Sequence, residues 1–311
     1  MIPRSALLLG LSLALLIVGQ LLLPGFLGVG QLANQLQIAA FLGLFALCQT
    51  LVISAGGQGL DLSVGAVATL GGILSAALLP ILGVWPAALL AVAAGLLVGS
   101  LNGVGVAVLG LPPLVATLTL ASVVDGGLIV AVSLFQPPNA ASPAIVTLAG
   151  RATLGVPHIV MLWAVIGAVT VWLLTRSAWG RRLFGTGANE TVALLSGTDT
   201  RTVRVVAYAL SGGIAGAAGV LLTGYVGQGF LGLGNAYVLT SIVAAAIGGV
   251  ALEGGRASYF GVACAAVVMT VLVSLLTAIA IGESGRQIVF GLTLLSFVAF
   301  DRWSSRGSAS K

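Results

Sequence analysis

The sequence contains very little charge: Asp, Glu, Lys and Arg together make up 6% of its 311 residues. A soluble globular domain carries about 25% charged residues, so water is excluded as the main solvent of this chain. Apolar residues make up 59% of the sequence, its mean hydropathy is +1.19, and 45 residues are glycine. This composition is typical of membrane-spanning helices that pack closely against one another.

Lysine occurs once, at Lys311, and histidine once, at His158. A phosphate-binding loop of the Walker A type needs a lysine in a glycine-rich turn, so this chain cannot hydrolyse ATP by that device. Cys48 and Cys264 lie in separate apolar stretches, and their spacing predicts neither a disulfide nor a metal site. Because the sequence also lacks the residue groupings of a membrane enzyme, we expect no catalytic residue, no metal and no cofactor.

Apolar stretches predict about ten membrane-spanning helices, since a helix needs about 20 residues to cross a bilayer. The predicted spans are 5–23, 36–55, 64–82, 87–108, 113–134, 157–175, 204–225, 237–251, 258–281 and 286–301. We interpret the first as a retained span rather than a signal peptide, because Pro24 and Gly25 follow it instead of a small-residue cleavage site. The sequence therefore predicts an all-α integral membrane protein with a single transmembrane domain over 1–311.

The basic residues favour one orientation in the membrane. With ten spans, both termini lie on one side. That side collects ten of the twelve basic residues, namely Arg4, five arginines within 176–204, Arg256, Arg302, Arg306 and Lys311, and leaves Arg151 and Arg286 on the other. The positive-inside rule assigns the side with more basic residues to the cytoplasm. This bias accounts for the isoelectric point of about 9.9, so we predict no nucleic-acid partner. We predict a cytoplasmic loop at 176–204, a short basic tail at 302–311, and both termini in the cytoplasm.

A short repeat divides the chain into two halves. GQGLDLSVG begins at Gly57, and GQGFLGLGN begins at Gly227, 170 residues later. This offset maps the first five spans onto the last five, and an odd number of spans makes the two halves inverted. Inverted repeats are frequent in transporters, which place their pathway at the repeat interface. We predict halves of about 1–150 and 151–303.

Asp61 lies between the second and third predicted spans, after glycines that weaken helix at 56, 57 and 59. Broken backbone at membrane depth is tolerated where protein or a water-filled cavity satisfies it, so Asp61 is a candidate to line a polar path. Alternatively, Asp61 or Ser63 simply caps the third span. The two interpretations are compatible.

Asp125 lies well inside the fifth predicted span. An acidic side chain at the centre of a spanning helix costs roughly 2.5–3.5 kcal/mol on insertion scales. It therefore either faces a hydrated cavity or polar partner, or lies near the outer interface, which the following Gly126 and Gly127 permit.

Small residues recur at helical spacing on the fourth and seventh predicted spans. They are Gly95, Gly99 and Gly103 on the fourth, and Gly212, Gly216 and Gly219 on the seventh. Such faces allow two helices to approach closely, and we expect packing rather than ligand binding. Asn102, beside the first face, is expected to hydrogen-bond across helices.

Four blocks of the sequence resemble the sugar-type permeases of bacterial ABC importers for ribose, xylose, arabinose and galactosides, within the branched-chain amino-acid/monosaccharide permease family. GGQGLDLSVGAVATLGG (56–72) resembles the family's GGIDLSVG signature, and NGVGVAVLGLPPLVATLTLAS (102–122) is similar to its NG…PPFIATLGT run. GTGANETVALLSGTDTRTVRVVAYALSG (185–212) resembles GGNExAARLSGI…YxLSG, and AAAIGGVALEGGRASYFGV (244–262) resembles VxGGTSLxGGRGS. The blocks keep the family's order and together cover most of residues 50–300.

The resemblance implies a type II ABC importer-like permease subunit in the bacterial inner membrane, which is not itself an enzyme. It would translocate a monosaccharide together with a second copy or a sister permease, cytoplasmic ABC ATPase subunits and a periplasmic sugar-binding protein. The resemblance assigns ATPase coupling to Asn189, Glu190, Ala193, Leu195, Ser196 and Gly197. Since sugars are neutral polyols, our candidates for the substrate pathway are polar residues: Gln58, Asp61, Ser63, Asp125, Gln228, Asn235 and Tyr237.

Some positions depart from the family pattern. Asp125-Gly126 stands where relatives commonly carry Arg-Gly, Glu253 replaces a small polar residue, and an extra Gln-Gly precedes Asp61. The identity of the sugar is therefore not inferred. Two alternatives stay open: a ten-helix secondary transporter of the drug/metabolite type, which needs no ATPase, and an ABC permease for nucleosides or branched-chain amino acids.

Overall fold

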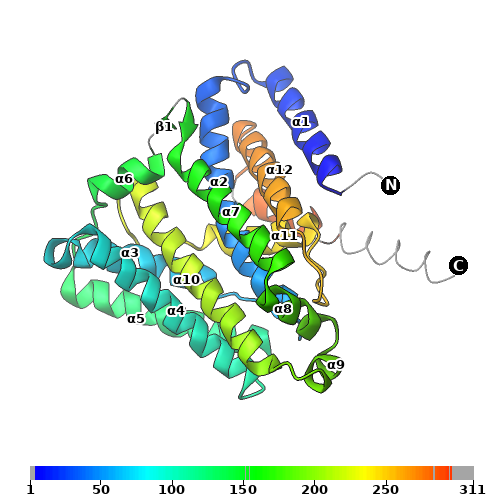
Figure 1. The fold of residues 1–311 in the computed structure, drawn as a ribbon. Helices are drawn as coiled ribbons and strands as arrows, with labels where there is room; N and C mark the ends of the chain where they lie inside the picture. The colour runs from blue at the N-terminus through cyan, green and yellow to red at the C-terminus, as the bar shows by residue number, and fades with distance from the viewer. Residues whose placement is uncertain (1–3, 151, 154, 283, 294, 296–311) are drawn as a thin grey trace, which may run out of the picture.

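The computed structural model describes residues 4–150, 152–153, 155–282, 284–293 and 295. Within these residues the chain is helical, apart from connecting segments and one small antiparallel hairpin of β1 (Ala152–Thr153) and β2 (Val156–Pro157) (Figure 1). The prediction of an all-α protein is therefore confirmed.

The helices match the predicted spans to within a few residues at most ends. The long ones are α1 (Arg4–Leu22), α2 (Val29–Ser54), α3 (Val64–Leu82), α4 (Val84–Ala107), α5 (Pro113–Phe135), α7 (His158–Arg176), α10 (Thr200–Val226) and α12 (Tyr259–Ala278). These eight are long and apolar enough to cross a membrane, and α11 (Ala236–Gly248) is a shorter apolar helix. Residues 284–293 are also helical. The end of the tenth predicted span and the tail at 302–311 lie outside the described residues.

The remaining helices are short and lie at opposite ends of the molecule. α6 (Pro143–Gly150) and the hairpin lie at one end, whereas α8 (Ala178–Ala188) and α9 (Glu190–Leu195) lie at the other (Figure 1). α8 and α9 occupy most of the segment predicted as a polar loop. They are the structured part of that loop and connect α7 to α10.

α2 and α10 form the centre of the molecule. Every residue of α2 from Ala39 to Ser54 is buried. α2 packs against α11 and α12, whereas α10 packs against α3 and α4, so each central helix contacts helices from the other half of the sequence. Figure 1 shows that α2 and α10 run in opposite directions. Because each central helix packs against helices of the other half, the two halves of the chain form one helical body.

The glycine face of α4 packs directly on α10, as predicted. A β-carbon at Gly103 would lie 2.7 Å from Cα of Val205, and β-carbons at Gly95 and Gly99 would overlap the carbonyl oxygens of Gly212 and Tyr208. Small residues on both helices thus let the two backbones touch, which supplies dispersion contacts where lipid offers no hydrophobic driving force.

Two irregular segments interrupt the helices inside the body. Residues 55–63 follow α2, and 227–235 follow α10. The second segment contacts the first turns of α3, because Gly234 N–H donates to Thr69 Oγ1 at 3.2 Å. α11 has 13 residues and is about 20 Å long, too short to cross a hydrocarbon core of about 30 Å. A start inside the body explains this length, and the surrounding helices satisfy the broken backbone.

Candidate functional site

The six residues assigned to coupling form one short helix with its two ends. Asn189 precedes α9, and its side chain accepts a hydrogen bond from Val192 N–H at 3.1 Å, which is a standard N-cap. Gly197 follows α9 with φ of +82°, and its N–H donates to the Leu194 carbonyl at 2.9 Å. Glycine suits this left-handed position at the end of a helix. Local sequence chemistry therefore sets where α9 begins and ends.

α9 exposes an apolar edge. Ala193 is buried against the body, whereas Leu195 is 84% exposed and Val192 is 60% exposed. Val192 and Ala193 also line an open cavity of about 490 Å³ together with Arg181 and Arg182 of α8. The surface formed by α8 and α9 therefore combines exposed aliphatic side chains with two arginines.

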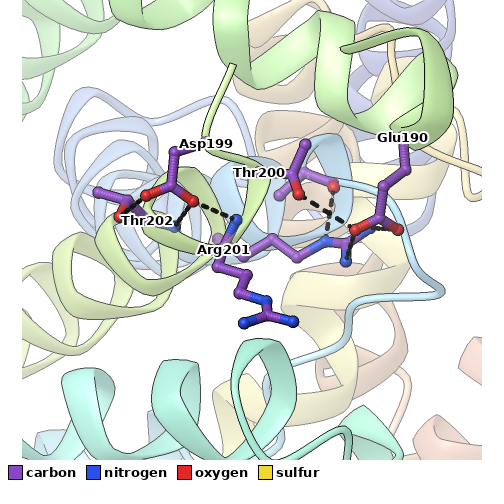
Figure 2. Close-up of polar contacts among 7 residues, drawn as sticks. Glu190, Asp199, Thr200, Arg201 and Thr202 are labelled. Carbon is purple, nitrogen blue, oxygen red and sulfur yellow. Dashed lines mark hydrogen bonds and ion pairs between the residues drawn. The ribbon is translucent and has the colours of Figure 1, made fainter. Parts of the chain in front are cut away.

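Glu190 binds Arg204 through two parallel hydrogen bonds. Arg204 Nη1 and Nη2 donate to Oε1 and Oε2 of Glu190, each at 2.8 Å, and Thr200 Oγ1 donates to the same carboxylate at 3.2 Å (Figure 2). Planar, bidentate pairs of this kind are among the strongest side-chain contacts. The hydrogen bonds from Arg204 lower the pKa of Glu190 below its usual value, so the carboxylate is ionised at neutral pH.

Arg204 also contacts the segment that follows α2. Its Nε donates to the Ala55 carbonyl at 3.4 Å. A β-carbon at Gly57 would lie 3.3 Å from Nη2 of Arg204, so glycine leaves room for the guanidinium. One side chain therefore connects α9, α10 and the segment 55–63.

Backbone from three distant parts of the sequence meets next to this arginine. Gly255 N–H donates to the Ser54 carbonyl at 3.2 Å. A β-carbon at Gly56 would lie 2.7 Å from Cα of Gly187, and one at Gly254 would lie 2.6 Å from Cα of Gly56. The end of α2, the end of α8 and the α11–α12 connection are thus packed without intervening side chains.

Asp61 lies in a fully buried network rather than on an open surface. It is 0% exposed, and its carboxylate accepts hydrogen bonds from Ser63 N–H at 3.0 Å, Ser63 Oγ at 2.6 Å and Ser211 Oγ at 2.8 Å. Gln49 holds the Asp61 backbone, donating from Nε2 to its carbonyl at 2.7 Å and accepting from its N–H at 3.3 Å. Asn102 donates to Ser63 Oγ at 2.8 Å, so its predicted bond across helices is confirmed.

We call Gln49, Asp61, Ser63, Asn102 and Ser211 the Asp61 network. Its members come from α2, the segment 55–63, α4 and α10. The carboxylate orients Ser63, the residue just before α3, but no side chain accepts a hydrogen bond from the first turn of that helix. The interpretation of Asp61 or Ser63 as a helix cap is therefore wrong in this conformation. In this conformation Asp61 and Ser63 have no exposed surface, and their place on a substrate pathway stays a prediction.

The other pathway candidates are scattered. Gln58 and Gln228 are exposed at opposite ends of the body; Gln58 adopts φ of +55°, and Gln228 forms a backbone bridge to Ala140. Asn235 lies just before α11, and the ring of Tyr237 stacks on that of Phe45 with centroids 4.7 Å apart. The structure does not bring these residues together with the Asp61 network.

Asp125 lies on α5, which has only three buried residues: Ala116, Thr117 and Leu128. Its side chain is partly exposed, and no described residue pairs with it. A β-carbon at the adjacent Gly126 or Gly127 would meet no atom within 4 Å. Gly126 and Gly127 therefore face away from every other described residue, whereas Asp125 itself is partly covered.

Sequence reasoning missed several residues of these sites. Arg204 was counted only among the basic residues, although its pair with Glu190 organises α9. Gln49 and Ser211 are polar residues within apolar helices, and that contrast is the sequence signal that points to a buried polar network. The residues next to them in the sequence do not indicate which residues they hydrogen-bond to.

The comparisons with known proteins identify the family. Residues 31–298 match the family model described as "Branched-chain amino acid transport system / permease component". The chain belongs to this permease family. The match begins within α2 and includes α8, α9, Arg204 and the whole Asp61 network.

Full-length relatives give the same result. The permease is 34% identical to the "Probable ABC transporter permease protein YphD" of Escherichia coli K12, over 88% of this chain and 81% of the relative. It is 32% identical to the "Ribose import permease protein RbsC" of Bacillus subtilis 168, over 96% of this chain and 92% of the relative. It is 30% identical to the "Fructose import permease protein FrcC" of Rhizobium meliloti, over 99% and 87%. No solved structure matches the chain significantly.

The permease is therefore a multi-pass membrane subunit of an ABC importer. Permease subunits of this family are not themselves enzymes. The alternative of a drug/metabolite-type secondary transporter is excluded by the family match.

Proposed function

We propose that the permease translocates a monosaccharide across the bacterial inner membrane, as one of two permease subunits that work with separate ATPase subunits and a periplasmic sugar-binding protein. The observation that carries this proposal is the similarity, over nearly the whole chain, to relatives named for ribose and fructose import. The same observation favours a sugar over the alternatives of a nucleoside or a branched-chain amino acid.

Two inverted halves are part of this proposal. Gly57 lies beside Arg204 at the α8–α9 end of the body. The second copy of the repeat lies at the other end, since Ala141 N–H donates to the Gly227 carbonyl at 2.9 Å and Gly229 N–H donates to the Asn139 carbonyl at 2.8 Å. Repeat copies at opposite ends are what an inverted duplication requires, and they support a pathway between rocking halves.

The surface of α8 and α9 is the proposed ATPase contact. Leu195 and Val192 expose apolar surface to water on a short helix, and this exposure is unfavourable unless a partner covers the two side chains. The positive-inside rule places this arginine-bearing end in the cytoplasm. A cytoplasmic groove with an apolar floor and acidic rim would complement both Leu195 and the two arginines of α8.

Replacing Leu195 with glutamate is expected to reduce retention of the ATPase subunits at least tenfold. The change puts a charge on the most exposed aliphatic side chain of α9, and a desolvated charge opposes binding. Retention is measured as the ATPase recovered with tagged permease after solubilisation.

Leu109→Glu is the matched control, because Leu109 is 68% exposed and lies outside α8 and α9. It is expected to retain the ATPase at the unaltered level. Equal retention by Leu195→Glu and Leu109→Glu would contradict docking at α9.

For the pathway we propose the partly exposed polar residues rather than the whole predicted set. Tyr237 lines a cavity of about 280 Å³ together with Thr240 and Thr270. Asp125 is proposed to face the second permease subunit or a hydrated space between subunits, since lipid contact is costly there. Asn235 lines a cavity of about 150 Å³ next to the first.

Uptake of labelled solutes tests the substrate class. A bacterial strain that lacks its own ribose, fructose and leucine importers is supplied with this permease, its ATPase and its binding protein. We expect accumulation of a monosaccharide, with leucine and nucleoside uptake at background level. Leucine or nucleoside accumulation without any sugar uptake would overturn the sugar assignment and leave the ABC permease assignment intact.

A further inference from the structure

One face of α10 connects α9 to the irregular segment 55–63. Arg204, Tyr208 and Ser211 are spaced by four and three residues, so they lie on the same side of the helix. Arg204 contacts the start of the segment at the Ala55 carbonyl, and Ser211 contacts its end at Asp61 Oδ2. Tyr208 lies between them and is 1% exposed. α10 therefore holds the segment at two points, and one of these points also holds α9.

We propose that Arg204 is a positioning residue that passes a displacement of α9 to the segment 55–63. This inference rests on the proposed docking of an ATPase on α9. The guanidinium is planar and presents its donors in fixed directions: Nη1 and Nη2 hold Glu190, while Nε faces Ala55. If Glu190 shifts, the Arg204 guanidinium must either rotate with it or lose its hydrogen bonds to the carboxylate. Either change alters the hydrogen bond between Arg204 Nε and the Ala55 carbonyl, and so acts on the segment 55–63.

Few other contacts tie α9 to the body. α9 has six residues, of which only Ala193 is buried. The Arg204 side chain is 14% exposed and that of Glu190 is 44% exposed, so solvent and salt reach the pair from the Glu190 side but screen it less than a pair in which both side chains are open. Loss of Arg204 would leave α9 joined to α10 mainly by the Thr200 hydrogen bond and the connecting residues, while its packing on α8 would remain.

The far end of the segment lies where the two halves of the chain meet. Asp61 and Ser63 precede α3, and a β-carbon at Gly65 would lie 3.1 Å from the Gly234 carbonyl, just before α11. A displacement that enters at Ala55 therefore arrives at the contact between α3 and α11. This is the position from which the halves can be moved relative to each other.

Arg204→Met tests the proposal in the complete importer, reconstituted with its ATPase and binding protein in vesicles. Three quantities are measured: retention of the ATPase on the permease, the ATP hydrolysis rate, and transport of the substrate identified by uptake. We expect retention and hydrolysis within twofold of the unaltered importer. Transport per ATP hydrolysed should fall at least tenfold, because docking persists while the link to the segment is lost.

Arg201→Met is the matched control. Arg201 is exposed, and its guanidinium forms neither a hydrogen bond nor an ion pair with the other residues drawn in Figure 2. The substitution removes the same charge from the same helix three residues away. Transport per ATP is expected to stay within twofold, which separates the geometry of Arg204 from the general effect of a lost cation.

Arg204→Lys decides the matter if Arg204→Met does not fold. Lysine keeps the charge but has a single nitrogen, which cannot hold both carboxylate oxygens and the Ala55 carbonyl in the same geometry. We expect a monodisperse protein with transport per ATP reduced about threefold to tenfold. Unchanged transport per ATP in a folded variant would overturn the inference, as would a loss of ATPase retention parallel to the loss of transport. If the unaltered permease itself never retains an ATPase, the proposed function fails instead.

Discussion

Replacing Asp61 with alanine is expected to remove most of the folded permease. The substitution takes the acceptor away from two Ser63 donors and from Ser211, all of which are buried. Each buried donor left without a partner costs about 1–3 kcal/mol, so the three together approach the whole stability of a typical domain. The measurement is the fraction of monodisperse protein in fluorescence-detected size-exclusion chromatography.

Asp61→Asn separates the shape of the side chain from its charge. Asparagine keeps one acceptor oxygen, and its amide group can donate to the Ser211 hydroxyl, so most of the protein should remain folded. Asp125→Ala is the matched control for loss of a carboxylate, because no described residue pairs with Asp125. It should elute like the unaltered permease. Equal elution of Asp61→Ala and Asp125→Ala would show that the network does not support the fold.

The same variants bear on the predicted pathway. If Asp61→Asn folds and transports normally, the carboxylate is needed for the structure rather than for the solute. If Asp61→Asn folds but transports poorly, the charge itself matters and the pathway interpretation gains support. A structural role and a pathway role of Asp61 are thus separated by one isosteric change.

The helices could be predicted from the sequence because membrane insertion is a local property. A stretch of about 20 apolar residues is enough to define a span, and the described helices begin and end close to the predicted bounds. The glycines before Asp61 also predicted a break in the backbone, since glycine populates positive φ readily. Gly56 and Gly57 do have positive φ, of +76° and +65°.

Pairings between distant residues could not be predicted in this way. Asp61 meets Ser211 across 150 residues of sequence, and Arg204 reaches Ala55 across 149. No periodicity links these positions, and one sequence contains no record of which polar residues change together. The resemblance assigned coupling to residues 189–197, yet it did not indicate that Glu190 is held by Arg204.

The structure of α9 shows where local rules do suffice. Asn189 and Gly197 are residues that begin and end helices, so the short helix between them can be deduced from residue types alone. Its attachment to the body cannot, because the partner of Glu190 lies on the next helix.

A single methyl group at position 219 is expected to separate α10 from α3. A β-carbon on Gly219 would overlap the carbonyl oxygen of Ala68, and backbone cannot move aside as a flexible side chain does. Overpacking of a close contact typically costs about 1–3 kcal/mol, which corresponds to a fall in melting temperature of about 2–5 °C for Gly219→Ala in a chain of this length. The melting temperature is read from intrinsic fluorescence of the purified permease.

Gly10→Ala is the matched control for this change, since Gly10 lies in α1 and a β-carbon there would meet no atom within 4 Å. Alanine favours helix over glycine by about 0.5–1 kcal/mol, so Gly10→Ala should melt at the unaltered temperature or slightly above it. The two changes in melting temperature are expected to have opposite signs because the atoms around the two glycines differ, although the substitution is the same. Similar melting temperatures for the two variants would mean that α10 and α3 are not in backbone contact, and the central packing of the permease would have to be redrawn.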